Sequence, residues 1–285
     1  MNQVRGLDYY WRLCATAFCF AVFGLCGLVF GLIVFPLMRL IPGDPATHRR
    51  RVRTTFLNVM RWFAGLMRAV GVLTYEFEGA ERLGRPGQMV MANHPTLIDV
   101  VFLLGFTPQT TCIVKQAMYK NVFTRWPVAA AGFVCNTPTF DMIERAAQAL
   151  REGQSVIIFP EGTRTTPGQA MQFQRGAASI AVRAAAVITP VFIRCEPTTL
   201  AKNMPWYRIP PRRVRITFRV GDDIDPRPFR QAPAPLASRA LNEHLLKVFE
   251  AELTTGGQPA SAGVALETRG AFRAPPKTQR HRRLH

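Results

Sequence analysis

Acidic side chains are scarce in this chain of 285 residues, which has 36 Lys and Arg against 18 Asp and Glu and a formal net charge of +18. This excess of positive charge indicates an anionic partner, either a nucleic acid or an anionic membrane surface. The sequence has no zinc-finger, RNA-recognition or helix-turn-helix signature, which argues against nucleic acid. We therefore expect the positive charge to meet anionic membrane lipids.

Closely spaced cysteines are also missing, because neither C-x-x-C nor C-x-x-H occurs. This argues against a zinc site and favours reduced thiols in a cytoplasmic domain. The chain has no G-x-S-x-G motif, and neither Ser155 nor Ser179 has a histidine nearby in the sequence. The sequence therefore offers no serine nucleophile for a covalent intermediate. No metal and no bound cofactor is expected.

One stretch, residues 13–38, contains no charged side chain at all. As a helix it would reach about 39 Å, more than the ~30 Å hydrocarbon core of a bilayer. It is too long for a signal peptide, and no A-x-A cleavage site follows it. Gly27 and Gly31 form a G-x-x-x-G pair, which suits either close helix packing or a bend into a re-entrant pair. We expect residues 1–48 to be a membrane anchor, either spanning or re-entrant.

Arginines are more numerous after this run than before it. The positive-inside bias therefore places the rest of the chain in the cytoplasm, at the inner membrane. Residues 49–72 follow with apolar side chains at helical spacing, and Arg53, Arg61 and Arg68 are expected on the opposite face. Such an amphipathic helix either lies in the interface among anionic headgroups or packs on the domain that follows.

Short apolar strands alternate with helical patterns over residues 73–253, which we interpret as one catalytic domain. The alternation predicts an α/β fold with a mainly parallel central sheet flanked by helices. Strands are expected at 73–77, 88–92, 112–114, 155–159, 188–193 and 214–220, and helices at 97–105, 141–152, 174–186 and 239–253. The proline-rich stretch 222–238 is expected to be a linker. Residues 254–285 have too little apolar surface to order, so a disordered basic tail is predicted.

The stretch NHPTLID, residues 93–99, follows one of these strands. His94 is thus placed at the carboxyl end of a strand, where open α/β sheets bind ligands, and it can act as a general base at neutral pH. Asp99, one helical turn on, can orient the imidazole and stabilise its charged form. Alternatively, Thr96 and Asp99 form a capping box behind Pro95, and His94 is simply a buried histidine.

A second stretch, FPEGTR at residues 159–164, also follows an apolar strand. The glycine favours a tight turn, and the guanidinium of Arg164 can bind a phosphate through two hydrogen bonds. The alternative is a surface turn in which Glu161 and Arg164 form a local ion pair. Because two such constellations follow two different strands, we favour a functional site.

N-H-P-x-x-x-D, then F-P-E-G-T-R, then ITPVFI at residues 188–193 together resemble the glycerolipid acyltransferases. The resemblance covers residues 74–220. It implies transfer of an acyl chain from an acyl carrier protein or coenzyme A thioester to a lipid hydroxyl, and it is consistent with a membrane anchor. The acceptor implied first is 1-acyl-sn-glycerol-3-phosphate, with phosphatidic acid as product. The alternatives are a specialised acceptor lipid, or a non-catalytic lipid-binding scaffold on the same fold.

The resemblance also assigns roles to residues. His94 becomes the base and Asp99 its orienting partner. The other residues implied, all for substrate binding, are Glu161, Gly162, Thr163, Arg164, Lys115 and Asn136. The last of these departs from the family pattern, because AAGFVCN ends in Asn136 where the family usually has an arginine that contacts the acceptor phosphate. Phosphate binding would then depend on Lys115 and Arg164. Backbone N–H groups at the turns 95–96 and 162–163 are expected to stabilise the oxyanion. The sequence predicts no oligomeric state.

Overall fold

The computed structural model describes residues 6–137, 140–166 and 168–255. Its centre is a seven-stranded sheet in the order β1-β7-β6-β2-β5-β3-β4. The strands are β1 (Leu73–Glu78), β2 (Gln88–Ala92), β3 (Thr110–Lys115), β4 (Val134–Asn136), β5 (Ser155–Ile158), β6 (Val187–Glu196) and β7 (Val214–Val220). Neighbouring strands are parallel except for β6 and β7, which are antiparallel. The mainly parallel α/β fold is thereby confirmed.

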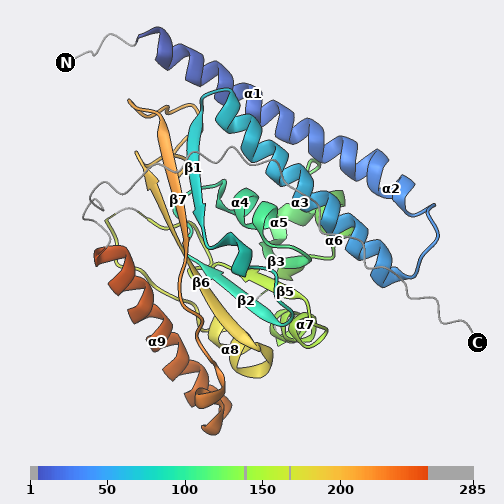
Figure 1. Cartoon of the computed structure of the whole chain (residues 1–285), viewed down its shortest axis with the longest axis vertical. Helices are drawn as coiled ribbons and strands as arrows, with labels where there is room; N and C mark the ends of the chain where they lie inside the picture. Colours follow the sequence, from blue (N-terminus) through green and yellow to red (C-terminus); the bar gives the residue numbers. More distant parts are fainter. Residues whose placement is uncertain (1–5, 138–139, 167, 256–285) are drawn as a thin grey trace, which may run out of the picture.

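Helices cover both faces of this sheet (Figure 1). One face is covered by α3 (Pro45–Ala69) and α4 (Asp99–Phe106), and the other by α7 (Phe140–Arg151), α8 (Arg175–Ala184) and α9 (Ala234–Thr255). Because both faces are covered, β2 is buried along its whole length and has a continuous apolar sequence around Val90. The buried core therefore continues to the strand ends where the two sequence motifs begin.

Several expected boundaries need correction. The linker expected at 222–238 is shorter, because α9 begins at Ala234 and a 3₁₀ turn occupies Arg227–Gln231. Strand β4 and the short helices α5 (Gln116–Lys120) and α6 (Arg125–Ala131) were not predicted, because they are too short to show a periodic pattern. The first residues of the expected tail belong to α9, and residues 256–285 lie outside the described residues.

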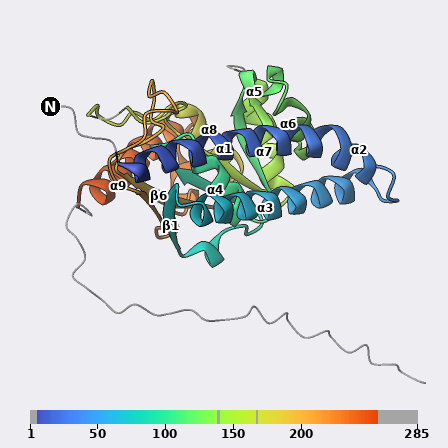
Figure 2. The same cartoon turned by 90° about the horizontal axis from the view of Figure 1, so that it is seen from above.

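The apolar run forms one continuous helical segment, Leu7–Met38. It consists of α1 (Leu7–Val29), a π-helical turn at Phe30–Val34 and α2 (Phe35–Met38). By length and composition it is able to cross a membrane, and only 17% of its most apolar window is buried. In both views it runs lengthwise beside α3 (Figures 1 and 2), where the rings of Phe23 and Phe63 lie 5.3 Å apart. It does not bend into a re-entrant pair, and a full span stays a prediction.

Helix α3 begins at Pro45. The residue before it, Asp44, caps the helix by accepting a hydrogen bond from the backbone N–H of Thr47. Its apolar side is buried in the core, so the protein itself covers that side, as the packed-helix alternative expected. Arg53 was expected on the solvent side but is only 8% exposed and donates to Ala131 and Gln154. At 100° per residue it lies about 80° from Arg61 around the helix, which turns it toward the protein. An interfacial location of α3 stays a prediction.

The glycines of the apolar helical segment, Gly27 in α1 and Gly31 in the π-helical turn, pack closely against the turn before α6 and against α6 itself. A Cβ atom on Gly27 would collide with the carbonyl oxygen of Phe123, and one on Gly31 would lie 2.8 Å from Pro127 Cδ. The close packing expected from the G-x-x-x-G pair is therefore present. Its partner is the α5–α6 region of the same chain.

We expect Gly27→Ala to loosen the contact between α1 and the α5–α6 turn. The added methyl group meets backbone, which cannot rotate away, and overpacking of this kind costs about 1–3 kcal/mol. Gly24→Ala is the matched control, because its Cβ would lie 3.4 Å from the Phe123 ring, at an ordinary contact distance. Thermal unfolding in micelles measures the difference, and equal melting temperatures for the two variants would contradict this packing.

Candidate active site

The two motif stretches meet at one edge of the sheet. His94 follows β2 and Phe159 follows β5, and these two strands are parallel neighbours. Both stretches therefore leave the sheet at the same edge, as the sequence predicted. The backbone connects them directly, because the N–H of Thr165 donates to the carbonyl oxygen of His94 at 2.7 Å. The histidine thus lies on a turn supported by the second motif.

Glu161 supplies the other half of that support. Its Oε1 accepts hydrogen bonds from the backbone N–H of His94 at 3.0 Å and from the hydroxyl of Thr165 at 2.8 Å. The side chain is only 9% exposed, and this burial raises the pKa of Glu161. Glu161 was assigned to substrate binding, but its Oε1 is engaged by these two donors. We interpret it as a positioning residue for His94.

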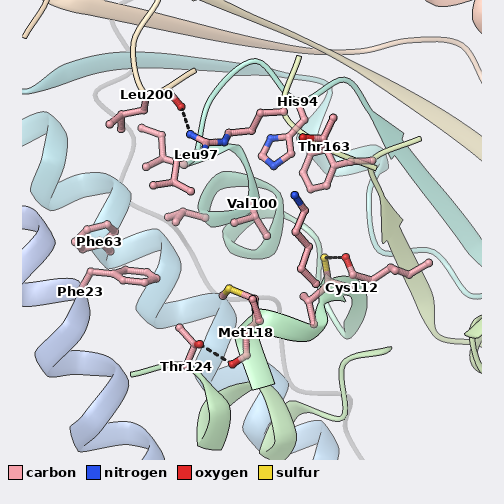
Figure 3. Close-up of a pocket in the computed structure, with 18 of the residues that line it drawn as sticks. Phe23, Phe63, His94, Leu97, Val100, Cys112, Met118, Thr124, Thr163 and Leu200 are labelled. Atoms are coloured by element: carbon pink, nitrogen blue, oxygen red, sulfur yellow. Dashed lines mark hydrogen bonds between the residues drawn. The ribbon is translucent and has the colours of Figure 1, made fainter. Parts of the chain in front are cut away.

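His94 and Asp99 form a hydrogen-bonded dyad, with Nδ1 and Oδ2 separated by 2.9 Å. Asp99 is fully buried, and this burial raises its pKa while hydrogen bonds from His94 and Thr96 oppose the rise. An ionised carboxylate only accepts hydrogen bonds, so a proton on Nδ1 faces Asp99 and leaves Nε2 as the basic nitrogen. The ring of His94 lies across the cavity from Phe23 and Phe63 (Figure 3). This arrangement suits a general base.

The two interpretations of Asp99 turn out to be compatible. Asp99 Oδ2 also accepts from the backbone N–H of Thr96 at 2.7 Å, and Oδ1 accepts from the Thr96 hydroxyl at 2.5 Å. The same carboxylate therefore holds the turn before α4 and orients His94. Both oxygens are engaged, which fixes the carboxylate in place.

Two residues that support His94 were not singled out from the sequence. The ring of Phe159 stacks on the imidazole, with centroids 4.0 Å apart and planes at 20°. The amide of Asn93 exchanges two hydrogen bonds of 2.8 Å with the backbone of Ile193 on β6. The side chain of Asn93 thereby takes the place of a hydrogen-bonded backbone pair just beyond the end of β2. The sequence signal was a polar residue at the end of a buried strand, which by itself has many explanations.

Next to the dyad lies a cavity of about 470 Å³ with mostly apolar walls. Helix α1 contributes part of the wall through Cys19, Phe20 and Phe23, and the domain contributes Phe63 and Met118. A neighbouring cavity of about 100 Å³ shares Phe23, Phe63 and Met118 with it. These dimensions and walls suit a hydrocarbon chain.

Cys112 in this cavity wall does not offer a nucleophile. Burial raises the pKa of Cys112 to about 12, so its thiol stays protonated at neutral pH. The chemistry of the cavity therefore depends on His94.

The polar residues expected at the acceptor side lie on the same cavity wall as His94. These are Lys115, Asn136, Gly162, Thr163 and Arg164. Lys115 ends β3 and Asn136 ends β4, and the two are paired in the parallel register, so they stand side by side. The structure thus brings together every residue assigned to substrate binding except Glu161, which lies behind His94.

Arg164 does not pair with Glu161, contrary to the surface-turn alternative. Its Nη1 instead donates to the carbonyl oxygens of Leu200 at 2.8 Å and Ala201 at 3.0 Å. The side chain is half-buried and lines the cavity. A guanidinium has five N–H donors, so Arg164 retains donors for a phosphate while Nη1 is engaged.

The expected oxyanion donors need correction. Pro95 has no N–H, and the N–H of Thr96 is committed to Asp99. The N–H of Gly162 donates to the carbonyl oxygen of Phe159. Of the four turn positions, the backbone N–H of Thr163 is the donor that the described residues leave unoccupied, and Thr163 lies on the cavity wall beside His94 (Figure 3).

Known proteins share this fold and sequence. Residues 74–194 match the family described as Acyltransferase. A 1-acyl-sn-glycerol-3-phosphate acyltransferase of Pseudomonas aeruginosa is 27% identical over 67% of this chain and 71% of its own length. A human relative, described as 1-acyl-sn-glycerol-3-phosphate acyltransferase beta, is 26% identical over 47% of this chain and 51% of its own. The fold matches the solved 1-acyl-sn-glycerophosphate (LPA) acyltransferase PlsC from Thermotoga maritima with a TM-score of 0.66 at 18% identity, covering 88% of this chain and 99% of that one.

A histidine–aspartate dyad beside an apolar cavity, on a chain with this match, defines an O-acyltransferase. The family match and the named relatives support the resemblance to the glycerolipid acyltransferases that the sequence predicted. An acyl donor and a lipid acceptor are accordingly its substrates, and its long apolar helix is consistent with membrane association.

Proposed function

We propose that this protein transfers a fatty acyl chain from an acyl carrier protein or coenzyme A thioester to 1-acyl-sn-glycerol-3-phosphate, giving phosphatidic acid. The observation that carries the proposal is the His94–Asp99 dyad at a cavity that combines apolar walls with Lys115 and Arg164. The apolar walls suit an acyl chain, and the two cations suit a phosphomonoester. The names of the relatives support the same acceptor.

The reaction then proceeds by direct transfer. Nε2 of His94 takes the proton of the acceptor hydroxyl as that oxygen forms a bond to the thioester carbonyl carbon. Asp99 stabilises the resulting imidazolium through Nδ1. Negative charge develops on the carbonyl oxygen, for which the N–H of Thr163 is the available donor. Collapse of the tetrahedral species breaks the carbon–sulfur bond, and the imidazolium returns its proton to the leaving thiolate. We expect no metal and no bound cofactor to take part.

Purified full-length protein in lipid micelles tests this proposal. Thiol release from the acyl thioester is followed with 1-acyl-sn-glycerol-3-phosphate, lysophosphatidylethanolamine and monoacylglycerol as competing acceptors, and products are identified by mass spectrometry. Preferred formation of phosphatidic acid is expected. Transfer to another acceptor alone would overturn the assignment of substrate. Absence of thiol release with every acceptor would leave the scaffold alternative.

One observation favours a specialised acceptor as the second candidate. Asn136 stands where the family usually has a cationic residue, and it is paired with Lys115 at the cavity wall. An amide donates hydrogen bonds but has no charge, so the site has one cation fewer for a phosphate than the family pattern implies.

We expect Asn136→Arg to improve the use of 1-acyl-sn-glycerol-3-phosphate. One added hydrogen bond between charged groups contributes about 1–3 kcal/mol, which would appear as a lower acceptor KM. Asn136→Gln is the control, since it lengthens the side chain without adding charge. Reduced activity of Asn136→Arg on all acceptors would show that the position faces something other than a phosphate, and would favour the specialised acceptor.

We also propose that the protein resides in the inner membrane, anchored by Leu7–Met38, with its catalytic domain in the cytoplasm against anionic lipids. The support is the excess of arginines after the apolar segment. A fluorescent reporter fused after Leu253 is expected to be active in the cytoplasm, whereas alkaline phosphatase at the same position is expected to be inactive. An active phosphatase fusion would show that the protein has the opposite orientation.

A further inference from the structure

The connection between β6 and β7, residues 197–213, is unusually long for a loop without regular structure. Trp206 and Tyr207 near its middle are 43% and 58% exposed. All charged side chains of the loop are basic, namely Lys202, Arg208, Arg212 and Arg213. Exposed aromatic rings among basic side chains are typical of protein segments at the boundary between membrane and water.

The loop is held against α1 by specific contacts. The rings of Phe20 and Trp206 lie 5.7 Å apart. Arg12, which is only 4% exposed, donates from Nη1 to the carbonyl oxygen of Pro210 at 2.8 Å and from Nη2 to that of Pro211 at 3.2 Å. The position of Trp206 relative to the apolar helix is therefore fixed by the fold.

Apart from Asp8 in its first turn, the exposed side chains of α1 are apolar. Its large exposed side chains include Leu7, Tyr10, Trp11, Phe18 and Leu25. On a neighbouring side of the helix, Phe20 contacts the ring of Trp206, and Gly24 lies against the ring of Phe123, which is 43% exposed. Phe20 and Gly24 are one helical turn apart, so both contacts lie on the same side of α1. Exposed aromatic residues of two distant segments, Trp206 and Phe123, thus lie beside the apolar helix.

The same loop forms part of the cavity rim. Leu97 lines the cavity and is 43% exposed, so it lies where the cavity reaches the surface. Its N–H donates to the carbonyl oxygen of Leu200 at 3.1 Å, and Arg164 donates to the same oxygen. Leu200 has a φ of 49°, a conformation that is uncommon for a residue other than glycine, so this backbone position is held by its contacts.

We propose that residues 197–213 form a membrane-contact loop whose partner is an anionic bilayer. Trp206 and Tyr207 enter the interfacial layer beside α1, and the basic side chains of the loop meet headgroup phosphates. The apolar side of α1 and the positive charge of the loop both fit this partner. The cavity rim at Leu97 and Leu200 then lies at the bilayer surface. The inference depends on the loop and its contacts, and it does not require a particular acceptor.

Fluorescence quenching in the full-length protein tests this placement. In one variant Trp206 is the only tryptophan, after Trp11→Phe, Trp62→Phe and Trp126→Phe. In the control variant all four tryptophans become Phe and Leu236→Trp supplies the signal, because Leu236 is 60% exposed on α9, over the opposite face of the sheet. Both are reconstituted into phosphatidylglycerol vesicles whose acyl chains are brominated near the headgroup. Trp206 is expected to lose most of its emission, and the control is expected to keep it.

Equal quenching of the two variants, or full access of aqueous acrylamide to Trp206 on vesicles, would overturn the proposal. If the multiple substitutions impair folding, Trp206→Phe alone suffices, because the emission lost between wild type and this variant reports the environment of Trp206.

The charges are tested separately with Arg208→Gln/Arg212→Gln in the Trp206-only background. Weaker quenching is expected in phosphatidylglycerol vesicles and not in phosphatidylcholine vesicles. Arg239→Gln/Lys247→Gln on α9 removes the same net charge and is expected to have no effect. If the loop variant behaves like this control, the headgroup contact of the proposal is wrong.

Discussion

His94→Ala is expected to lower turnover by about 10²–10⁴-fold, the usual effect of losing a general base. Nδ1 of His94 bonds to Asp99, which leaves Nε2 as the base at the cavity beside the acceptor-side residues. Without it, the acceptor hydroxyl must attack as a neutral alcohol. Thiol release from the acyl thioester measures the loss, and unimpaired turnover would disprove the mechanism.

Folding must be checked in the same variant, because Asp99 would lose a partner while remaining fully buried. Its burial already raises its pKa, so without the histidine the carboxyl is expected to take up a proton, which limits the destabilisation. Asp99→Asn is the matched comparison. An amide oxygen still accepts from Nδ1, so orientation is weakened while the base remains, and a smaller loss of turnover is expected. A larger loss than for His94→Ala would assign Asp99 more than an orienting role.

Arg164→Ala is expected to raise the KM for the acceptor more than the KM for the donor. Removing one partner of a charge-assisted pair costs about 2–5 kcal/mol, so roughly 30-fold or more in KM is expected. Because Arg164 is half-exposed, the lower part of that range applies. Donor binding should change little, and steady-state kinetics with each substrate varied in turn measures both effects.

Arg164 also holds the backbone at Leu200 and Ala201, so the variant needs a control. Arg164→Gln keeps a neutral donor for those carbonyl groups but removes the charge. If the charge binds phosphate, both variants lose activity with 1-acyl-sn-glycerol-3-phosphate. With monoacylglycerol, which has no phosphate, neither variant shows this loss. If Arg164→Gln instead behaves as wild type with both acceptors, the arginine acts only through the loop.

The sequence predicted the site correctly where the residue types and their spacing along the chain indicated the same arrangement. A histidine five residues before an aspartate, immediately after a buried strand, indicated a dyad, and the dyad is present at 2.9 Å. Parallel strands place their carboxyl ends together, so the meeting of His94 with Arg164 followed from the expected fold. The expected strands are all present, and two of them, β2 and β7, have the expected bounds.

What failed were inferences that depend on which way a side chain faces in three dimensions. The family resemblance assigned Glu161 to substrate binding, but its Oε1 accepts a hydrogen bond from the backbone N–H of His94, which is distant in sequence. Arg53 was expected on the face opposite the apolar side chains, but Gln154 and the end of α6 supply acceptors on the protein side. Asn93 bonds to a strand that lies a hundred residues away, and local sequence carries no record of that contact.

The apolar helix that is proposed to anchor the protein also forms part of the cavity beside the dyad. Cys19, Phe20 and Phe23 of α1 close one side of the cavity that contains His94. If the proposed anchor and acyl site are correct, exchanging this helix for an unrelated transmembrane helix is expected to keep the enzyme on the membrane yet remove one wall of the cavity. Engineering of this enzyme toward other fatty acids can therefore begin in the helix that would ordinarily be discarded to obtain a soluble fragment.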